Sequence, residues 1–545
     1  MALGLLLFSS TGHDDSHITY WVALALQRFG KLVNYNGERV EQSSSLAHVV
    51  LLALLGLVTR APMPTLGPLT SIGFGALAVG LTAKVARLVT PARGAELLAA
   101  TAVCFVYWGF GGLESTLFAA AALWLVLGGT RYLEAPSRKT LGWAAAAAAL
   151  FLTTRPETPL VLACALALTL AHAFHRRTGV RAVLVLAGVA ALEAGLVFAF
   201  RRAYFGSFFP NPVYTKATTV EVAAGLRYLK DNLFPWGLGL AVAFAAGLFA
   251  LGRAALDQAR FAAVLTLGLA LGYLGFVVCT GGDWMAGGRF LAHVLPLACV
   301  IAVAGVGRFL ANERARIAAV AVLTAANLYG TLAFADHGST GRPLWTTKAL
   351  RAQLDARIGD RGYGFFELSN KVHLRDTTVS AWLTDVVGAI RAKHPDRTLT
   401  LMASQAGMVP YHLFEKHYGA VRFLDMCSLA TTDFLRCLPK AMLQKRPVGM
   451  QLHFDRYFKD EAEVDKRCGT RRPDLVFGLG RRGIEAVLEK HGYTLVARQW
   501  GSIDNEATAG HLRTPLEADE FVAVDSQLLQ GVDYQRPAPF AWDVR

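Results

Sequence analysis

The sequence predicts a polytopic α-helical membrane protein with a water-soluble α/β domain at its C-terminal end. Of the 545 residues, 54% are hydrophobic and only 17% are charged, and the mean hydropathy is +0.38. A soluble globular domain is typically less apolar and more highly charged. The charges are also unevenly distributed, since residues 1–334 hold 14 of the 40 acidic and 25 of the 54 basic residues. We therefore expect a membrane domain over 1–334 and a soluble domain over 335–545.

The membrane domain contains a series of apolar segments that are typical of spanning helices. A spanning helix needs about 20 mostly apolar residues, although helices buried among neighbours can be shorter. Together with the N-terminal region, these segments predict about 11 membrane helices. The apolar stub 1–11 is too short to span, and it lacks the basic residues and cleavage site of a signal peptide, so we expect a truncated first helix. The candidate spans are 67–83, 94–110, 116–132, 141–154, 158–174, 182–200, 236–252, 261–280, 290–308 and 317–334.

The loops between these segments fall into two classes that alternate along the chain. Arginine and lysine in short loops mark the cytoplasmic side. The first class is basic and comprises 83–93, 131–139, 175–181, 252–260 and 308–316. The second class comprises 109–116, 154–159, 201–216 and 281–289. We therefore expect the second class, and the soluble domain that follows the last helix, to face outward.

The first outward loop, 12–45, is long and contains a helical pattern of its own. Apolar residues recur at helical spacing over 16–30, which predicts an amphipathic helix at the membrane surface. Asp15 could cap this helix, which would leave Asp14 for chemistry. The segment 44–60 has an apolar core of only 13 residues, about 20 Å as a helix, so we expect it to be re-entrant or partly inserted.

Carboxylates gather in the outward loops. Five or six of these loops each carry a carboxylate beside glycine, proline or arginine, which solubility alone does not explain. The convergence of these acids predicts a site that handles hydroxyls, a metal or a proton. Glu193 lies inside a predicted helix, where acids are functional candidates by default. The outward acids are Asp14, Asp15, Glu38, Glu41, Glu114, Glu157, Glu221, Asp231 and Asp283.

The sequence predicts a mixed α/β fold for the soluble domain. Strand-like segments are 398–404, 420–426, 473–479 and 493–499, and an amphipathic helix over 482–492 ends at a glycine. Three cysteines in this domain permit one disulfide and one remaining thiol. The domain could bind the acceptor of a reaction, or it could be a structural cap.

Several motifs together resemble membrane glycosyltransferases of the GT-C fold, and most closely the AftB-type terminal arabinofuranosyltransferases and their bacterial relatives. The likeness covers nearly the whole chain, with a looser match over 404–429. It implies an enzyme of the bacterial inner (plasma) membrane whose active site faces the periplasm or cell exterior. The motifs are "DDSHITYW" (14–21), "NYNGERVEQSSSL" (34–46), "GGLEST" (111–116), "RPE" (155–157), "FPNPVYTK" (209–216) and "GGDWMAGGRF" (281–290).

The resemblance also implies the reaction and its partners. A sugar would pass from a polyprenyl-phosphate donor, for which decaprenyl-phospho-arabinofuranose is the candidate, to a cell-envelope glycan or glycoprotein. A carboxylate would take the proton of the acceptor hydroxyl, with Asp14 as first choice and Asp15 as second. The candidates that bind the donor phosphate are Arg289, Arg155 and Lys216. The candidates that orient sugar hydroxyls are Asp283, Glu114, Glu157, Asn211 and Glu41.

Other interpretations compete with these assignments. Arg155 and Glu157 could simply pair across a proline turn, and Arg289 could extend along the helix end towards water. Some proteins of this fold use a divalent cation, but no liganding spacing here requires one. A transporter or flippase of lipid-linked sugars is the main alternative function, although we find no internal repeat. The net charge of +14 lies largely in membrane loops, so we expect no nucleic-acid partner.

Overall fold

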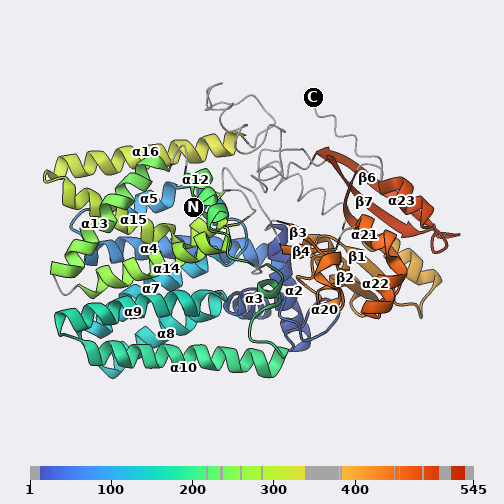
Figure 1. Cartoon of the computed structure of the whole chain (residues 1–545), viewed down its shortest axis with the longest axis horizontal. Helices are drawn as coiled ribbons and strands as arrows, with labels where there is room; N and C mark the ends of the chain where they lie inside the picture. Colours follow the sequence, from blue (N-terminus) through green and yellow to red (C-terminus); the bar gives the residue numbers. More distant parts are fainter. Residues whose placement is uncertain are drawn as a thin grey trace.

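The computed structural model describes a helical part and a C-terminal part built on a β-sheet (Figure 1). The two parts are joined around α2 and α3, which lie between the long helices and the sheet. This arrangement confirms the predicted fold class of many apolar helices followed by an α/β domain. The described residues are 13–216, 219–233, 237–257, 260–283, 287–337, 380, 383–446, 449–452, 454–481, 484–502 and 517–533.

Most predicted spans are helices. Seven of the described helices are long and apolar enough to cross a membrane, which is fewer than the expected count of about 11. The stub 1–11 lies outside the described residues. The helices of this part are α2 (Asp14–Phe29), α3 (Leu46–Thr59), α4 (Met63–Val89), α5 (Ala95–Thr101), α6 (Val103–Trp108), α7 (Ser115–Glu134), α8 (Arg138–Thr154), α9 (Thr158–Arg176), α10 (Val180–Phe205), α11 (Asn211–Lys216), α12 (Val222–Leu233), α13 (Leu238–Asp257), α14 (Phe261–Thr280), α15 (Arg289–Phe309) and α16 (Glu313–His337).

The predicted helix 94–110 is broken into α5 and α6. Ala102 between them has an extended backbone, with φ −78° and ψ 134°. Such a break leaves carbonyl groups without helical partners. Two side chains of α16 supply donors, because Asn327 Nδ2 lies 3.3 Å from the Leu98 carbonyl and Thr331 Oγ1 lies 2.7 Å from the Thr101 carbonyl. The break therefore depends on a helix more than 200 residues away in the sequence.

Helix α2 differs from the expected surface helix. Its residues 16–25 are all buried, on every side of the helix. It packs between α3 and α4 on one side and the C-terminal domain on the other. Position 13 is the N-cap and Asp15 lies inside the first turn, so Asp15 is not the capping residue.

The C-terminal domain contains a five-stranded sheet in the order β2-β1-β5-β7-β6. The four predicted strands correspond to β1 (Leu399–Ala403), β2 (Val421–Asp425), β5 (Leu475–Arg481) and β6 (Tyr493–Ser502). Strands β1, β2 and β5 are parallel, whereas β7 (Glu517–Asp525) is antiparallel to β5 and β6 and lies between them. Strand β7 was not predicted, and its first half is acidic in sequence.

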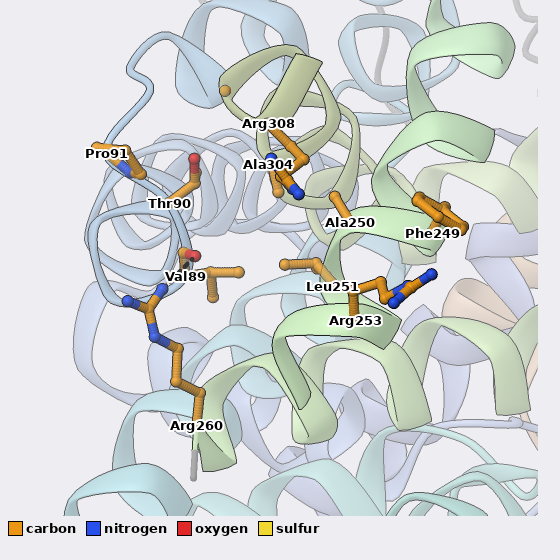
Figure 2. Close-up of a pocket in the computed structure, with 11 residues that line it drawn as sticks. Val89, Thr90, Pro91, Phe249, Ala250, Leu251, Arg253, Arg260, Ala304 and Arg308 are labelled. Atoms are coloured by element: carbon orange, nitrogen blue, oxygen red, sulfur yellow. Dashed lines mark hydrogen bonds between the residues drawn. The ribbon is translucent and has the colours of Figure 1, made fainter. Parts of the chain in front are cut away.

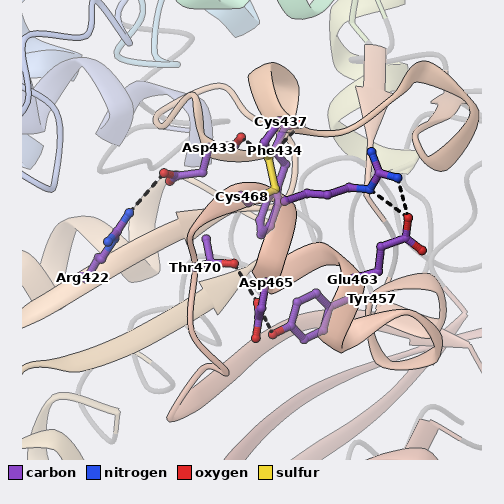
Figure 3. The surroundings of a disulfide bond; sticks show 10 residues. Arg422, Asp433, Phe434, Cys437, Tyr457, Glu463, Asp465, Cys468 and Thr470 are labelled. Atoms are coloured by element: carbon purple, nitrogen blue, oxygen red, sulfur yellow. Dashed lines mark hydrogen bonds and ion pairs between the residues drawn. A yellow bond between two sulfur atoms is a disulfide. The ribbon is translucent and has the colours of Figure 1, made fainter.

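A disulfide joins two short helices beside this sheet (Figure 3). It links Cys437 of α20 (Asp433–Cys437) to Cys468 of α22 (Glu461–Cys468). The third cysteine, Cys427, keeps its thiol, which donates to the Ser404 carbonyl at 3.1 Å. The prediction of one disulfide and one remaining thiol is confirmed.

Polar side chains of the first outward loop fix the C-terminal domain to the helical part. Tyr35 donates to the Ala406 carbonyl at 2.9 Å, and Asn36 donates to the Phe423 carbonyl at the same distance. Apolar residues of α2, α3 and the sheet form one continuous core around these contacts. The helical part therefore contacts the domain through α2, α3 and the segment between them.

Candidate functional site

Arg289 lies at the centre of the first charge cluster. It is the first residue of α15 and follows Gly288, whose φ of 65° turns the chain into the helix. Its Nη1 lies 3.2 Å from Asp15 Oδ2, and its Nη2 lies 3.0 Å from Asp283 Oδ1. The guanidinium is nine-tenths buried, so it does not extend into water as the alternative interpretation required. The structure thus joins three of the predicted site residues.

Asp15 is held in its ionised form by surrounding cations. Burial by itself would raise the pKa of its carboxyl, but the charges of Lys216, Arg289 and His13 outweigh burial and lower this pKa. Lys216, at the end of α11, makes the largest of these favourable contributions. At neutral pH the cluster therefore presents a carboxylate with two cations beside it.

A second cluster surrounds Arg155, between α8 and α9. Its Nη1 lies 2.5 Å from Glu114 Oε1, and its Nε pairs with Glu157. Both carboxylates directly precede helices, Glu114 at the start of α7 and Glu157 at the start of α9. The proposed pairing of Arg155 with Glu157 across the turn is confirmed, and Glu114 completes a buried group of three charges.

Phe290 joins the two clusters. Its ring centroid lies 5.2 Å from the guanidinium carbon of Arg155 and 5.4 Å from that of Arg289. Tyr228 fixes this ring by accepting the backbone N–H of Phe290 at 3.1 Å. Trp108 adds a second ring, 5.9 Å from the Arg289 guanidinium carbon. These aromatic residues had no predicted role, although Phe290 lies within the motif 281–290.

Asp14 points to a different partner from Asp15. Its Oδ1 accepts the backbone N–H of Met408 at 2.7 Å, at the start of α19 (Met408–His417). A carboxylate in this position stabilises a helix N-terminus. Gly407 is needed here, because a Cβ atom at this position would lie 2.2 Å from the Asp14 carbonyl oxygen. The Asp14 carboxylate thus contacts the C-terminal domain, whereas that of Asp15 contacts Arg289.

Glu41 and Asn211 form a separate junction. Arg201 donates to Glu41 through Nε at 2.9 Å, and both side chains are buried. The backbone N–H of Asn211 donates to the Glu41 carbonyl at 2.8 Å. The Asn211 amide donates to carbonyls of the loop after β2, at 2.6 Å for Ser428 and 3.1 Å for Leu429. These contacts join α10 and α11 to the C-terminal domain.

Within the described part of the chain, no group of three His, Cys, Asp or Glu side chains could hold a metal ion. Each carboxylate of the two clusters is instead paired with an arginine. Together the clusters offer carboxylates as hydrogen-bond acceptors and three cationic side chains, Arg155, Arg289 and Lys216. Such an arrangement can bind an anion and deprotonate a hydroxyl.

Comparison with known proteins finds similarity only among solved structures. No protein-family model matches the chain, and no curated protein matches it. ArnT from Cupriavidus metallidurans, solved with undecaprenyl phosphate, is 15% identical over 96% of both chains, with a TM-score of 0.47. The oligosaccharyltransferase AglB from Archaeoglobus fulgidus, solved with an inhibitory peptide and a dolichol-phosphate, is 13% identical, with a TM-score of 0.47. That match covers 86% of this chain and 66% of AglB. Likeness at this level assigns neither a family nor an activity.

Proposed function

We propose that the protein is a membrane glycosyltransferase of the GT-C fold. It transfers a sugar from a polyprenyl-phosphate donor to a cell-envelope glycan or glycoprotein, and D-arabinofuranose is the sugar to test first. The observation that carries this proposal is the convergence of Asp15, Arg289 and Lys216, which lie at the ends of three helices far apart in the sequence, α2, α15 and α11. Their motifs are those that resemble the arabinofuranosyltransferases.

Asp15 is the general base in this proposal, ahead of Asp14. Asp15 is ionised and lies beside the two cations that suit a phosphate leaving group, whereas Asp14 accepts the Met408 N–H. The donor phosphate would bring negative charge next to Lys216 and Arg289. This charge would offset their effect on Asp15 and raise its pKa, so the carboxylate becomes a stronger base when the donor is bound.

The remaining acids bind the sugar and the acceptor. Asp283, Glu114 and Glu157 are acceptors for sugar hydroxyls, and their negative charge favours a transition state of oxocarbenium character. Arg155 balances two of these carboxylates, so we assign it a positioning role rather than binding of the donor phosphate. Glu41 and Asn211 hold the C-terminal domain above the site.

Two features support an outward-facing site at the bacterial inner membrane. The basic loops favour a cytoplasmic location for the opposite end of the helices. The disulfide between Cys437 and Cys468 suits the oxidising periplasm or cell exterior, because cytosolic disulfides are rare. The C-terminal domain and the charge clusters then share one side of the membrane.

The test is transfer from polyprenyl-phospho-arabinofuranose by the purified protein. Asp15→Asn should reduce turnover by about 10²–10⁴-fold, the usual contribution of a general base. Glu134→Gln, an exposed acid at the end of α7, is the matched control and should leave turnover unchanged. A larger loss of turnover in Asp14→Asn than in Asp15→Asn would identify Asp14 as the general base. If the protein translocated the lipid-linked sugar in proteoliposomes without transferring it, the protein would be a flippase and not a transferase.

A further inference from the structure

A cavity lies at the end of α15 opposite to Arg289. Figure 2 shows the residues that line it. Arg289 begins α15 and Arg308 lies in its last turn, so the two are about 30 Å apart at 1.5 Å per residue. The cavity encloses about 490 Å³ between the ends of α4, α13 and α15. Its lining residues are Val89, Thr90, Pro91, Phe249, Ala250, Leu251, Arg253, Arg260, Ala304, Gly307 and Arg308.

Three arginines surround this cavity, each from a different segment. Arg253 lies near the end of α13, Arg260 just before α14, and Arg308 at the end of α15. Arg260 Nη1 donates to the Val89 carbonyl at 3.3 Å, which places it at the rim. The cavity therefore combines concentrated positive charge with room for an anion.

The rim also has an exposed aromatic surface. Phe249 and Phe309 stack with their ring centroids 6.1 Å apart, and their exposed fractions are 55% and 58%. The guanidinium carbon of Arg253 lies 5.5 Å from the Phe249 ring centroid. Exposed rings at the end of a membrane helix suit the boundary between headgroups and acyl chains. The cavity thus opens beside an apolar surface that acyl chains could cover.

We infer that this cavity binds the phosphate headgroup of an anionic phospholipid. Basic pockets between membrane helices on the cytoplasmic side are typical sites for such headgroups. The three basic loops that form this end, 83–93, 252–260 and 308–316, contain eight basic and two acidic residues. The arginines would contact the phosphate while the acyl chains lie along Phe249 and Phe309. The site is independent of the proposed transfer reaction.

The experiment measures binding of short-chain phosphatidylglycerol to the full chain in a neutral detergent. We expect saturable binding about tenfold tighter than that of phosphatidylcholine. Each basic residue near such a headgroup contributes about fivefold, so the variant Arg253→Gln/Arg260→Gln/Arg308→Gln should lose about 100-fold in affinity. If this variant does not fold, the three single variants carry the test, each with a loss of about fivefold.

A matched control removes three charges from the same class of loops. The variant Arg138→Gln/Lys139→Gln/Arg181→Gln changes exposed residues that do not line the cavity. It should alter affinity by less than about twofold, because none of the three side chains lines the cavity and exposed charges are screened by salt. Equal binding of the two lipids, or an equal loss in both variants, would overturn the inference. Displacement of the lipid by equimolar inorganic phosphate would overturn it too, by showing a site for a soluble anion.

Discussion

Substitution of Arg155 gives the sharpest test of how the charge clusters are held. The side chains of Arg155, Glu114 and Glu157 are only 10%, 7% and 4% exposed. The variant Arg155→Gln would leave two carboxylates buried without a cation. Removing one partner from a buried ion pair typically costs about 3–5 kcal/mol. We expect a loss of this size in the free energy of unfolding.

A variant of the same cluster without charges distinguishes the effect of uncompensated buried charge from that of altered packing. In Arg155→Met/Glu114→Gln/Glu157→Gln no charge remains buried, and such replacements are often neutral in stability. We therefore expect the triple variant to unfold within about 1–2 kcal/mol of the wild type. Thermal unfolding of the purified proteins in one detergent measures both variants. Arg138→Gln, at an exposed position, is the control and should change stability by less than about 0.5 kcal/mol.

Two results would contradict this reasoning. If Arg155→Gln unfolded at the temperature of Arg138→Gln, the buried carboxylates would not depend on Arg155. If the triple variant were as unstable as Arg155→Gln, the loss would come from altered packing and not from uncompensated charge. An unchanged unfolding temperature together with a raised KM for the donor would restore the interpretation of Arg155 as a phosphate-binding residue.

Three further predictions concern other parts of the molecule. Donor binding should raise the pKa of Asp15. On the acidic side, kcat should therefore begin to fall at a higher pH than kcat/KM does. Asn211→Leu should leave the Ser428 carbonyl without its donor and lower the free energy of unfolding by about 1–3 kcal/mol. It should also speed hydrogen exchange at the junction between the helical part and the C-terminal domain, whereas the control Asn327→Leu should not. Burial raises the pKa of Asp425 to about 6, so the folded state binds this proton more tightly than the unfolded chain. The domain's free energy of unfolding should then increase as the pH falls from 6 towards 3.8, and Asp425→Asn should flatten this slope.

The sequence by itself determined most helices and strands of this protein. Apolar runs fixed the position of the spans, because the local pattern of side chains decides which segments can leave water. Turn residues and β-branched runs likewise located four of the strands. Local patterns could not reveal the break at Ala102, which depends on Asn327 and Thr331 of another helix. They also missed β7, which pairs with β5 on one side and with β6 on the other.

Only the tertiary structure decided which charges meet. The sequence favoured Asp14 for chemistry and Asp15 as a helix cap, yet Asp15 pairs with Arg289, 274 residues away, and Asp14 with the backbone of Met408, 394 residues away. Arg155 was assigned to a phosphate, but its guanidinium contacts Glu114 as well as Glu157. The physical reason is that the alternation of loops predicts which helix ends share a side of the membrane. It does not specify which of those ends lie within hydrogen-bonding distance of one another, because that depends on how the helices pack.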